Sequence, residues 1–489
     1  MPDIRYVCLS DMHLGEEDSL LTNLKKASSE PDPTDASPVM KQLVECLRDL
    51  ISKNVSSQKP TLILNGDILE MALTTDNQAA MCFDRFIELI MPQGNELFEK
   101  IIYIPGNHDH HLWESARETQ YVNYISKPEN SPDALKLGKK LDPPWHATNI
   151  FVEDDPNPVT AYFLTKLIQR FPHLQKKDAR ITTAYPNFGL ISRDYKKCIL
   201  FHHGHLIEPL YYMMSKLKTL IFSQSKMPKH VWEIEEENFA WIDFFWSTMG
   251  RSGQVGQNVE VIYEKMQDPD EFKKLLSNFV DGLDKEYDLP GWDLASAKIL
   301  KFVLHLLVDR ISKSERSQTA HTLSKDAEKG LLSYMSEPLK EQILNELKEA
   351  RKIMDMPTDV TLVFGHTHKP FEQKRNFGYP EWVKVYNTGG WVVETVDPQP
   401  LHGGAVVLID ENLDATSLRM YNELVDQNKY LVTVKEALHP GEKNNPFHEH
   451  ITTKLVNTSQ PPWSRFSSDI ARAVSVRAQN LRARINKRA

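Results

Sequence analysis

Cysteine is scarce in this sequence, and the four that occur are widely spaced. Cys8, Cys46, Cys82 and Cys198 form no CxxC pair. This spacing argues against a disulfide framework and favours buried, reduced thiols. We therefore expect a protein of a reducing compartment.

Long hydrophobic runs are also missing. The most apolar stretch, residues 299–311, is interrupted by charges and too short to cross a bilayer. The N-terminus lacks the charged segment and long apolar run of a signal peptide, and residues 4–10 are predicted to be a buried strand instead. These absences predict a cytoplasmic, soluble protein.

The sequence has no excess of basic residues. It contains 58 lysines and arginines against 67 acidic residues, with a formal net charge of −9 at pH 7. A protein that grips nucleic acid with its whole surface is therefore disfavoured, although a local basic patch stays open. The 489 residues are 40% hydrophobic, which suits two to four domains or one domain with large insertions.

Five short apolar runs share one shape, and they span residues 4–10, 61–65, 101–105, 198–202 and 360–364. Continuous apolar runs of this length predict strands that are buried on both faces. Each run is followed closely by Asp, His or Asn. Because functional groups gather beyond the carboxyl ends of strands, we expect these residues to converge along one sheet edge. Later runs predict strands of a second sheet at residues 384–388, 404–409 and 416–420.

The segments after the five runs carry candidate metal ligands, and they read SDMHLG, NGDILE, PGNHD, HHGH and FGHTHKP. Their donors are histidine nitrogens, carboxylate oxygens and an amide oxygen, without any thiolate. This donor set suits Mn, Fe, Zn or Co, with manganese favoured. Seven ligands are more than one metal needs. Two divalent ions about 3.5–4 Å apart, sharing one carboxylate, would use all seven.

In this order, the five segments resemble the pattern of the calcineurin-like metallophosphoesterase superfamily: D-x-H, GD-x-x-[DE], GNH[DE], an HG block and GHxH. The resemblance covers residues 3–110, 185–206 and 358–422. It implies an α/β fold, a four-layer α/β/β/α metallophosphoesterase sandwich with a large helical cap insertion. It also implies hydrolysis of a phosphoester, phosphodiester or pyrophosphate bond by a hydroxide that bridges two metals.

The resemblance carries specific roles onto seven candidate ligands. Asp11, His13 and His368 match ligands of the first metal, and Asp67 matches the carboxylate that both metals share. The remaining ligands match the second metal or the HG block, and they are Asn107, His203 and His366.

Two further residues match the family's acid catalysis. His108 matches the general acid, which protonates the leaving oxygen or contacts the phosphoryl group. Glu70 stands where the family often has a carboxylate that supports this histidine.

Other histidines of the motifs have weaker claims. The residue before glycine is favoured as ligand, so His202 is expected to close its strand, and His205 to support the site or face the substrate. Asp109 is expected to support its loop by hydrogen bonds. His110 and His111 have no counterpart in the family pattern, and surface or packing roles are expected for them.

The motifs divide the chain into a core and three additions. The core spans residues 1–206 and 358–435, with a loop-rich excursion at 112–180. Residues 207–357 are predicted to be a helical cap over the active site, with apolar stripes that either pack helix on helix or form a substrate groove.

Residues 436–489 form a C-terminal extension with a basic helix. Its last 20 residues contain six bases and no acid. The segment is predicted to be solvated or docked on the acidic body, and contact with a membrane surface or a polyanion stays open.

The motifs leave the substrate unresolved. The insertion between HGH and GHTH, and the Asn-Thr-Gly-Gly-Trp-Val stretch at residues 387–392, resemble the UDP-2,3-diacylglucosamine pyrophosphatase branch. A phosphorylated small-molecule or lipid-like substrate is therefore expected, and nucleic acid is less favoured. Two alternatives stay open: an SbcD-type DNA nuclease, and a non-catalytic scaffold that binds a partner through its cap.

Overall fold

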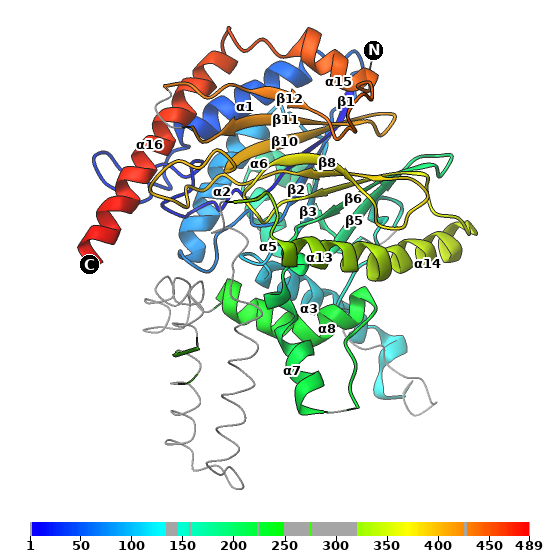
Figure 1. Ribbon diagram of the computed structural model, residues 1–489. Helices are drawn as coiled ribbons and strands as arrows, with labels where there is room; N and C mark the ends of the chain where they lie inside the picture. The colour runs from blue at the N-terminus through cyan, green and yellow to red at the C-terminus, as the bar shows by residue number, and fades with distance from the viewer. Residues whose placement is uncertain are drawn as a thin grey trace.

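The apolar runs of the sequence form strands in two stacked β-sheets, with helices on both outer faces (Figure 1). The computed structural model describes residues 2–133, 145–155, 158–222, 224–248, 273–274, 277, 320–424 and 428–488. The layer order confirms the predicted four-layer α/β/β/α sandwich.

The first sheet has seven strands. Its parallel half runs β1-β2-β3-β4, and the antiparallel half joins it through the pairing of β1 with β10. In spatial order the strands are β12 (Thr433–Lys435), β11 (Ala415–Asn422), β10 (Gly403–Asp410), β1 (Ile4–Leu9), β2 (Thr61–Asn65), β3 (Lys100–Ile104) and β4 (Ile181–Thr183).

The second sheet has five strands, with β6, β7 and β9 parallel at its centre. Strands β5 and β8 close its two edges in antiparallel orientation. In spatial order the strands are β5 (Asn187–Ile191), β6 (Lys197–His202), β7 (Asp359–Phe364), β9 (Val383–Asn387) and β8 (Phe371–Arg375).

The three later runs do not build a sheet of their own, so that expectation was wrong. Strand β9 joins the second sheet beside β7, whereas β10 and β11 extend the first sheet from the edge of β1. Periodicity identifies a strand, but its partner is set by tertiary pairing.

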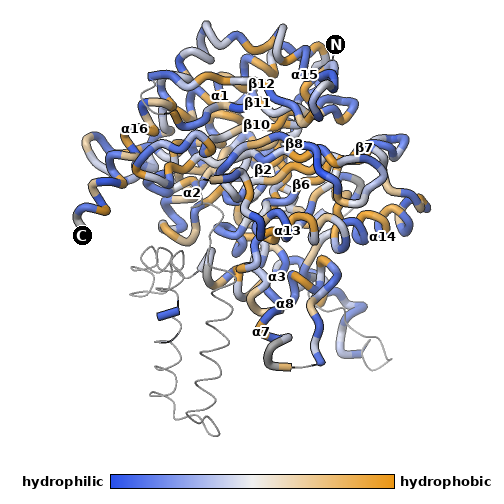
Figure 2. Tube along the Cα trace, in the orientation of Figure 1, coloured by the Kyte–Doolittle hydropathy of each residue, from blue (hydrophilic) through white to orange (hydrophobic). Residues whose placement is uncertain are grey.

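Alternate side chains of the central strands point into different layers. In β1, Val7 and Leu9 pack toward the outer helices of the first sheet, whereas Cys8 lies between the sheets. In β6, Leu200 faces the outer helices of the second sheet and Phe201 lies between the sheets. Hydrophobic colour therefore gathers along β10, β2 and β6 in the middle of the molecule (Figure 2).

Helices of the N-terminal half and the C-terminus cover the first sheet (Figure 1). Helix α1 begins at Pro38. The preceding Ser37 is its N-cap, because the Ser37 hydroxyl accepts a hydrogen bond of 3.0 Å from the Met40 amide. This layer comprises α1 (Pro38–Ile51), α2 (Asp76–Ile90), α5 (Tyr162–Ile168), α15 (Pro446–His450) and α16 (Trp463–Arg488).

The described part of the predicted cap is helical, and it packs on the second sheet. It contains α7 (Met213–Ile221), α8 (Val231–Ile242), a π-helical segment (Asp243–Thr248), α13 (Lys325–Tyr334) and α14 (Lys340–Arg351). Most of residues 249–319, which were also predicted to belong to the cap, lie outside the described residues.

The excursion at residues 112–180 is less loop-rich than expected, because its described part contains α3 (His111–Ile125), α5 and α6 (Pro172–Lys176). In α3, buried side chains occupy only the first two turns, at Leu112, Trp113, Ala116 and Arg117. A helix with so little apolar pattern gives a weak sequence signal.

Two further findings concern the cysteines and the helices. All four cysteines are free and buried, as the sequence predicts. Within the described ranges, no helix combines the length and apolarity that crossing a membrane requires.

A buried carboxyl group joins the cap to the core. Glu235 of α8 accepts a hydrogen bond of 2.7 Å from the Tyr185 hydroxyl, and neither side chain is exposed. Burial raises the pKa of Glu235 to about 8, against the opposing effect of the Tyr185 hydrogen bond.

We expect Glu235→Gln to change how stability depends on pH. Between the ordinary pKa of 4.5 and about 8 the folded chain holds a proton that the unfolded chain has lost, so Glu235 makes stability fall as pH rises through this window. In denaturant unfolding, the free energy of unfolding of the variant relative to wild type should rise by at least about 1 kcal/mol between about pH 5 and pH 9. The matched control is Glu236→Gln, whose side chain is exposed. Parallel profiles for wild type and Glu235→Gln would contradict the prediction.

Candidate metal centre

The predicted ligands come together where the carboxyl ends of both sheets meet. Loops after β1, β2 and β3 of the first sheet face loops after β6 and β7 of the second. The expectation of one sheet edge was therefore wrong, because the motif strands are divided between two stacked sheets. The seven side chains are at most 2% exposed: Asp11, His13, Asp67, Asn107, His203, His366 and His368.

Six of the seven ligands form two groups of donor atoms. The first group contains Asp11, His13 and His368, and the second contains Asp67, His203 and His366; within each group the donor atoms lie within 4.8 Å of one another. We call these the first and the second metal site.

Asn107 and Asp67 complete this arrangement. His203 Nε2 lies 3.1 Å from Asn107 Oδ1 and 3.2 Å from Asp67 Oδ2, so these three donors face one point. The same Asp67 oxygen lies 3.6 Å from His13 Nε2 of the first site. Asp67 thus stands between the two sites, where a shared carboxylate is required.

The ligand loops adopt an uncommon backbone conformation. Asp11, His13, Asp67, His366 and His368 all have positive φ angles, between 44° and 69°. Such conformations cost of the order of 1 kcal/mol or more per non-glycine residue, and they persist when surrounding contacts impose them. Here the contacts are hydrogen bonds between loops, including Asp11 N to Gly66 O at 2.9 Å and His366 N to Asp11 Oδ1 at 2.8 Å.

Two glycines allow these loops to approach closely. A Cβ atom at Gly106 would lie 2.2 Å from Asp67 Oδ1, and one at Gly365 would lie 2.0 Å from Asp11 Oδ2. No real side chain tolerates such contacts, so the shared carboxylate and its neighbour need glycine beside them.

Each ligand histidine has one ring nitrogen held by an oxygen. His13 Nδ1 lies 2.8 Å from Glu70 Oε2, and His203 Nδ1 lies 3.1 Å from the carbonyl of Asn65. A held N–H fixes the tautomer, so the opposite nitrogen of each ring is the one that faces the metal site.

Two glutamates that the motifs did not identify hold the other two rings. Glu208 Oε1 lies 2.5 Å from His366 Nε2, and Glu394 Oε1 lies 2.7 Å from His368 Nδ1. Both are mostly buried. Their positions, just after the HHGH segment and in the stretch after GHTHKP, carry no motif signal. Of the two, only Glu208 lies within a few residues of a ligand histidine, and that histidine is His203 and not its partner His366.

The expected pairing of Glu70 with His108 is present. His108 Nδ1 lies 2.8 Å from Glu70 Oε2 and 3.0 Å from Glu70 Oε1. Burial alone would raise the pKa of Glu70, but the charges and hydrogen bonds of His108 and His13 outweigh it and hold this pKa well below its usual range. Glu70 therefore supports both the predicted acid and a ligand, a double role that the sequence did not reveal.

Asp109 holds the ligand loops together, as expected. Its carboxylate accepts hydrogen bonds from the amides of Gly106 at 2.7 Å, Ile68 at 2.8 Å and Asp67 at 3.2 Å. It therefore links the loop after β3 to the loop after β2.

The neighbouring His110 and His111 differ from the simple expectation. His111 Nδ1 lies 3.2 Å and His110 Nδ1 3.6 Å from Asp243 Oδ1 of the π-helical segment. They join the metal loop to the cap, which is a packing role with a specific charged partner. Only the folded chain brings Asp243 to them.

His202 and His205 lie behind the ligands. His202 ends β6, as predicted, and its ring packs 4.9 Å from that of Tyr334. His205 is fully buried, with its ring 5.4 Å from that of Tyr211 and its Nε2 3.4 Å from the Tyr185 hydroxyl. The substrate contact expected for His205 stays a prediction.

The carboxylates of the centre are strongly coupled to the histidines. Burial opposes the ionisation of Asp67, but the charges of His203 and His108 outweigh it and hold the pKa of Asp67 well below its ordinary value. Burial and the carboxylates of Asp67 and Asp11 act in opposite directions on His203, and the net effect raises its pKa to about 9. The carboxylates and His203 therefore stabilise each other's charged forms.

Comparison with known proteins agrees with this geometry. A family model described as calcineurin-like phosphoesterase matches residues 4–248, which is half of the chain. The chain belongs to the calcineurin-like phosphoesterase family. As a member, it is a metal-dependent phosphoric ester hydrolase, and the resemblance found in the sequence is confirmed. The match ends before His366 and His368, yet the fold brings both to the other ligands.

Two other comparisons complete the findings. Among solved structures, a dimetal phosphatase from Danio rerio matches with 10% sequence identity and a TM-score of 0.28, covering 87% of this chain and 98% of that one. Comparison with curated proteins gives no match.

The residues of this phosphoesterase fit two divalent cations. Asp11 and Asp67 are completely buried, and burying carboxylates is costly unless cations neutralise them. The seven donors are nitrogen and oxygen, shared between two sites through Asp67, and each ligand ring already has its outer nitrogen held. This is the donor chemistry of a dinuclear centre.

We expect Glu208→Gln and Glu394→Gln to act on different metals. Loss of the charged partner should weaken Mn²⁺ binding about 10-fold at the second site for Glu208→Gln and at the first site for Glu394→Gln. Isothermal titration calorimetry on the full chain measures both affinities. A suitable control is Glu349→Gln on exposed α14 surface. If either variant lost Mn²⁺ affinity equally at both sites, the assignment of the histidine that its glutamate holds, His366 or His368, to a single site would be contradicted.

Proposed function

We propose that this phosphoesterase hydrolyses a phosphoester of a small molecule at a centre that holds two divalent cations, with manganese favoured. The observation that carries the proposal is the convergence of seven buried nitrogen and oxygen donors into two groups that meet at Asp67. A structural metal site would need only four such donors, whereas a pair of ions suits phosphoryl transfer.

The proposed roles follow from the contacts. Asp11, His13 and His368 would hold the first ion, Asn107, His203 and His366 the second, and Asp67 both. Two bound cations would polarise the phosphoryl group and lower the pKa of a water between them. The ligand loops position these cations, and the interloop hydrogen bonds keep the loops from relaxing.

His108 is proposed to donate the proton that the leaving oxygen needs. Glu70 holds its Nδ1, so Nε2 is the nitrogen that would face the leaving group. The same contact fixes the orientation of the imidazole ring. Glu70 is therefore a positioning residue for the acid.

The cap supports a compact substrate. Ser247 of the π-helical segment donates a hydrogen bond of 2.7 Å to the carbonyl of Asn107, and the Tyr211 ring lies 5.4 Å from the ring of His366. Cap residues thus touch the backbone or ring of two proposed ligands. A small phosphorylated molecule reaches a centre covered in this way more readily than a long nucleic acid does.

The panel that tests the proposal contains a phosphomonoester, a phosphodiester, a nucleotide-sugar pyrophosphate and single-stranded DNA, each with Mn²⁺. We expect turnover of at least one small substrate and loss of all turnover in Asp67→Asn, because the shared carboxylate is removed. Asp355→Asn, at an exposed position, is the control. Cleavage of DNA alone would favour the nuclease. A protein that binds no metal and hydrolyses none of the four would be the scaffold instead.

We expect His108→Ala to depend on the leaving group. The kcat for an alkyl phosphate should fall about 10²–10⁴-fold, and that for p-nitrophenyl phosphate much less, because a good leaving group needs little protonation. Glu70→Gln should show the same trend and, in addition, weaker Mn²⁺ binding, since Glu70 also holds His13. A uniform loss across leaving groups in His108→Ala would rule out the acid role.

A further inference from the structure

The C-terminal helix α16 lies on the opposite side of the first sheet from the cap (Figure 1). Its apolar side chains Trp463, Phe466, Ile470 and Val474 are at most 1% exposed and belong to the same core cluster as α1. Their spacing is that of one helix face. The basic segment predicted from the sequence is therefore the end of a helix that is docked on the body.

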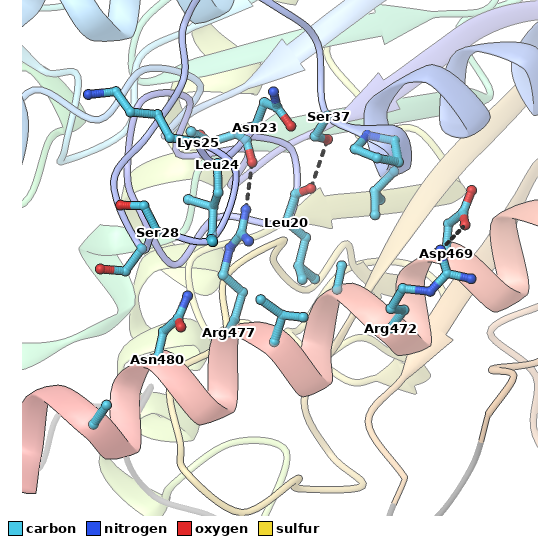
Figure 3. Close-up of a pocket in the computed structure, with 18 of the residues that line it drawn as sticks. Leu20, Asn23, Leu24, Lys25, Ser28, Ser37, Asp469, Arg472, Arg477 and Asn480 are labelled. Atoms are coloured by element: carbon cyan, nitrogen blue, oxygen red, sulfur yellow. Dashed lines mark hydrogen bonds and ion pairs between the residues drawn. The ribbon is translucent and has the colours of Figure 1, made fainter.

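Arg477 continues this buried face with a charged group. Its side chain is 5% exposed, and its guanidinium donates hydrogen bonds to the carbonyl of Thr22 at 2.6 Å and of Ser19 at 3.0 Å. Figure 3 shows Arg477 reaching from α16 toward the loop that carries Leu20, Asn23 and Leu24, beside a cleft of about 500 Å³. Burying a charged guanidinium costs free energy unless hydrogen bonds compensate it, and the two carbonyls provide them.

Arg484 makes a second attachment two turns later. It forms ion pairs with Glu17, at 2.9 Å, and with Asp18. Asp18 itself is joined to the stretch that precedes Glu394, because its carbonyl accepts a hydrogen bond from the Val393 amide at 3.2 Å. Two arginines of α16, Arg477 and Arg484, therefore contact one short loop, residues 17–22.

This loop in turn holds the backbone of the first metal site. The Ser19 hydroxyl donates a hydrogen bond of 2.7 Å to the carbonyl of Met12, the residue between Asp11 and His13. The Leu20 amide bonds to the Trp391 carbonyl at 2.7 Å, and the Trp391 amide bonds to the Asp11 carbonyl at 3.0 Å. Arg477 is thus two hydrogen bonds away from the Asp11–His13 backbone.

The first metal site needs such support. Asp11 and His13 have φ angles of 49° and 44°, a region that is unfavourable for residues with a side chain. Without external contacts, the loop would relax to an ordinary conformation and its two donors would separate. Beside the bonds to the neighbouring ligand loops, hydrogen bonds from Ser19 and Trp391 supply such contacts, and Arg477 fixes Ser19.

We propose that Arg477 is a positioning residue for the first metal, and that α16 is a brace that keeps the Asp11–His13 loop in its metal-binding conformation. This rests on the proposed dinuclear function for the identity of the ligand. It predicts a selective effect: loss of Arg477 loosens the first metal and leaves the second, whose ligands follow β2, β3, β6 and β7, nearly unchanged.

The test measures Mn²⁺ affinity in two full-chain backgrounds, each with one site disabled. In His203→Ala only the first site remains, and in His368→Ala only the second. Adding Arg477→Met should raise the dissociation constant about 10-fold in the first background and less than about twofold in the second. Arg477→Lys should restore part of the loss, because one donor returns. Arg472→Ala, a 75% exposed position on the same helix, is the matched control.

Several outcomes would overturn the proposal. Equal losses in both backgrounds would make Arg477 a general stability residue, and no loss in either would remove its role. If Arg477→Met does not fold, Ser19→Ala tests the same link from its other end, because it removes the hydroxyl that bonds to the Met12 carbonyl and accepts from the Leu21 amide. Unchanged first-site affinity there would overturn the brace. A wild-type chain that binds no Mn²⁺ would instead contradict the proposed function, which separates the two failures.

Discussion

The structure depends on one electrostatic constraint, the burial of Asp11 and Asp67 beside each other. Neither carboxylate is exposed, and their like charges oppose one another. Histidines from four different loops surround them and supply the neighbouring positive charge, which two divalent cations would supply more strongly. The fold must therefore bring loops from both sheets to one point.

The two sheets meet this constraint through the ends of their parallel strands. Hydrogen bonds join the ligand loops of one sheet to those of the other. Five of the ligands have positive φ angles in these loops. The cost of these conformations explains the number of restraints around the centre. Asp109 links two loops, and Glu70, Glu208 and Glu394 hold histidine rings. The cap contacts the loop after β3, and α16 contacts the loop at residues 17–22.

Much of this could be predicted from the sequence. The run at residues 61–65 coincides with β2, and the run at 360–364 differs from β7 by one residue, because continuous apolar runs between polar loops are a local signal. All seven predicted ligands converge, and Glu70 contacts His108, because those residues follow strands within motifs of fixed spacing. The sandwich and the family follow from the same motifs.

The sequence by itself thus determined the strands, the donor set and the chemistry of the centre, since each depends on neighbours within a few residues. Only the tertiary structure decided which strands share a sheet and which groups support the ligands. Glu208 meets His366 across 158 positions of the chain, Asp243 meets His111 across 132, and Arg477 meets Ser19 across 458. Such partners leave no local pattern, because long-range hydrogen bonds and ion pairs are selected by how the layers pack.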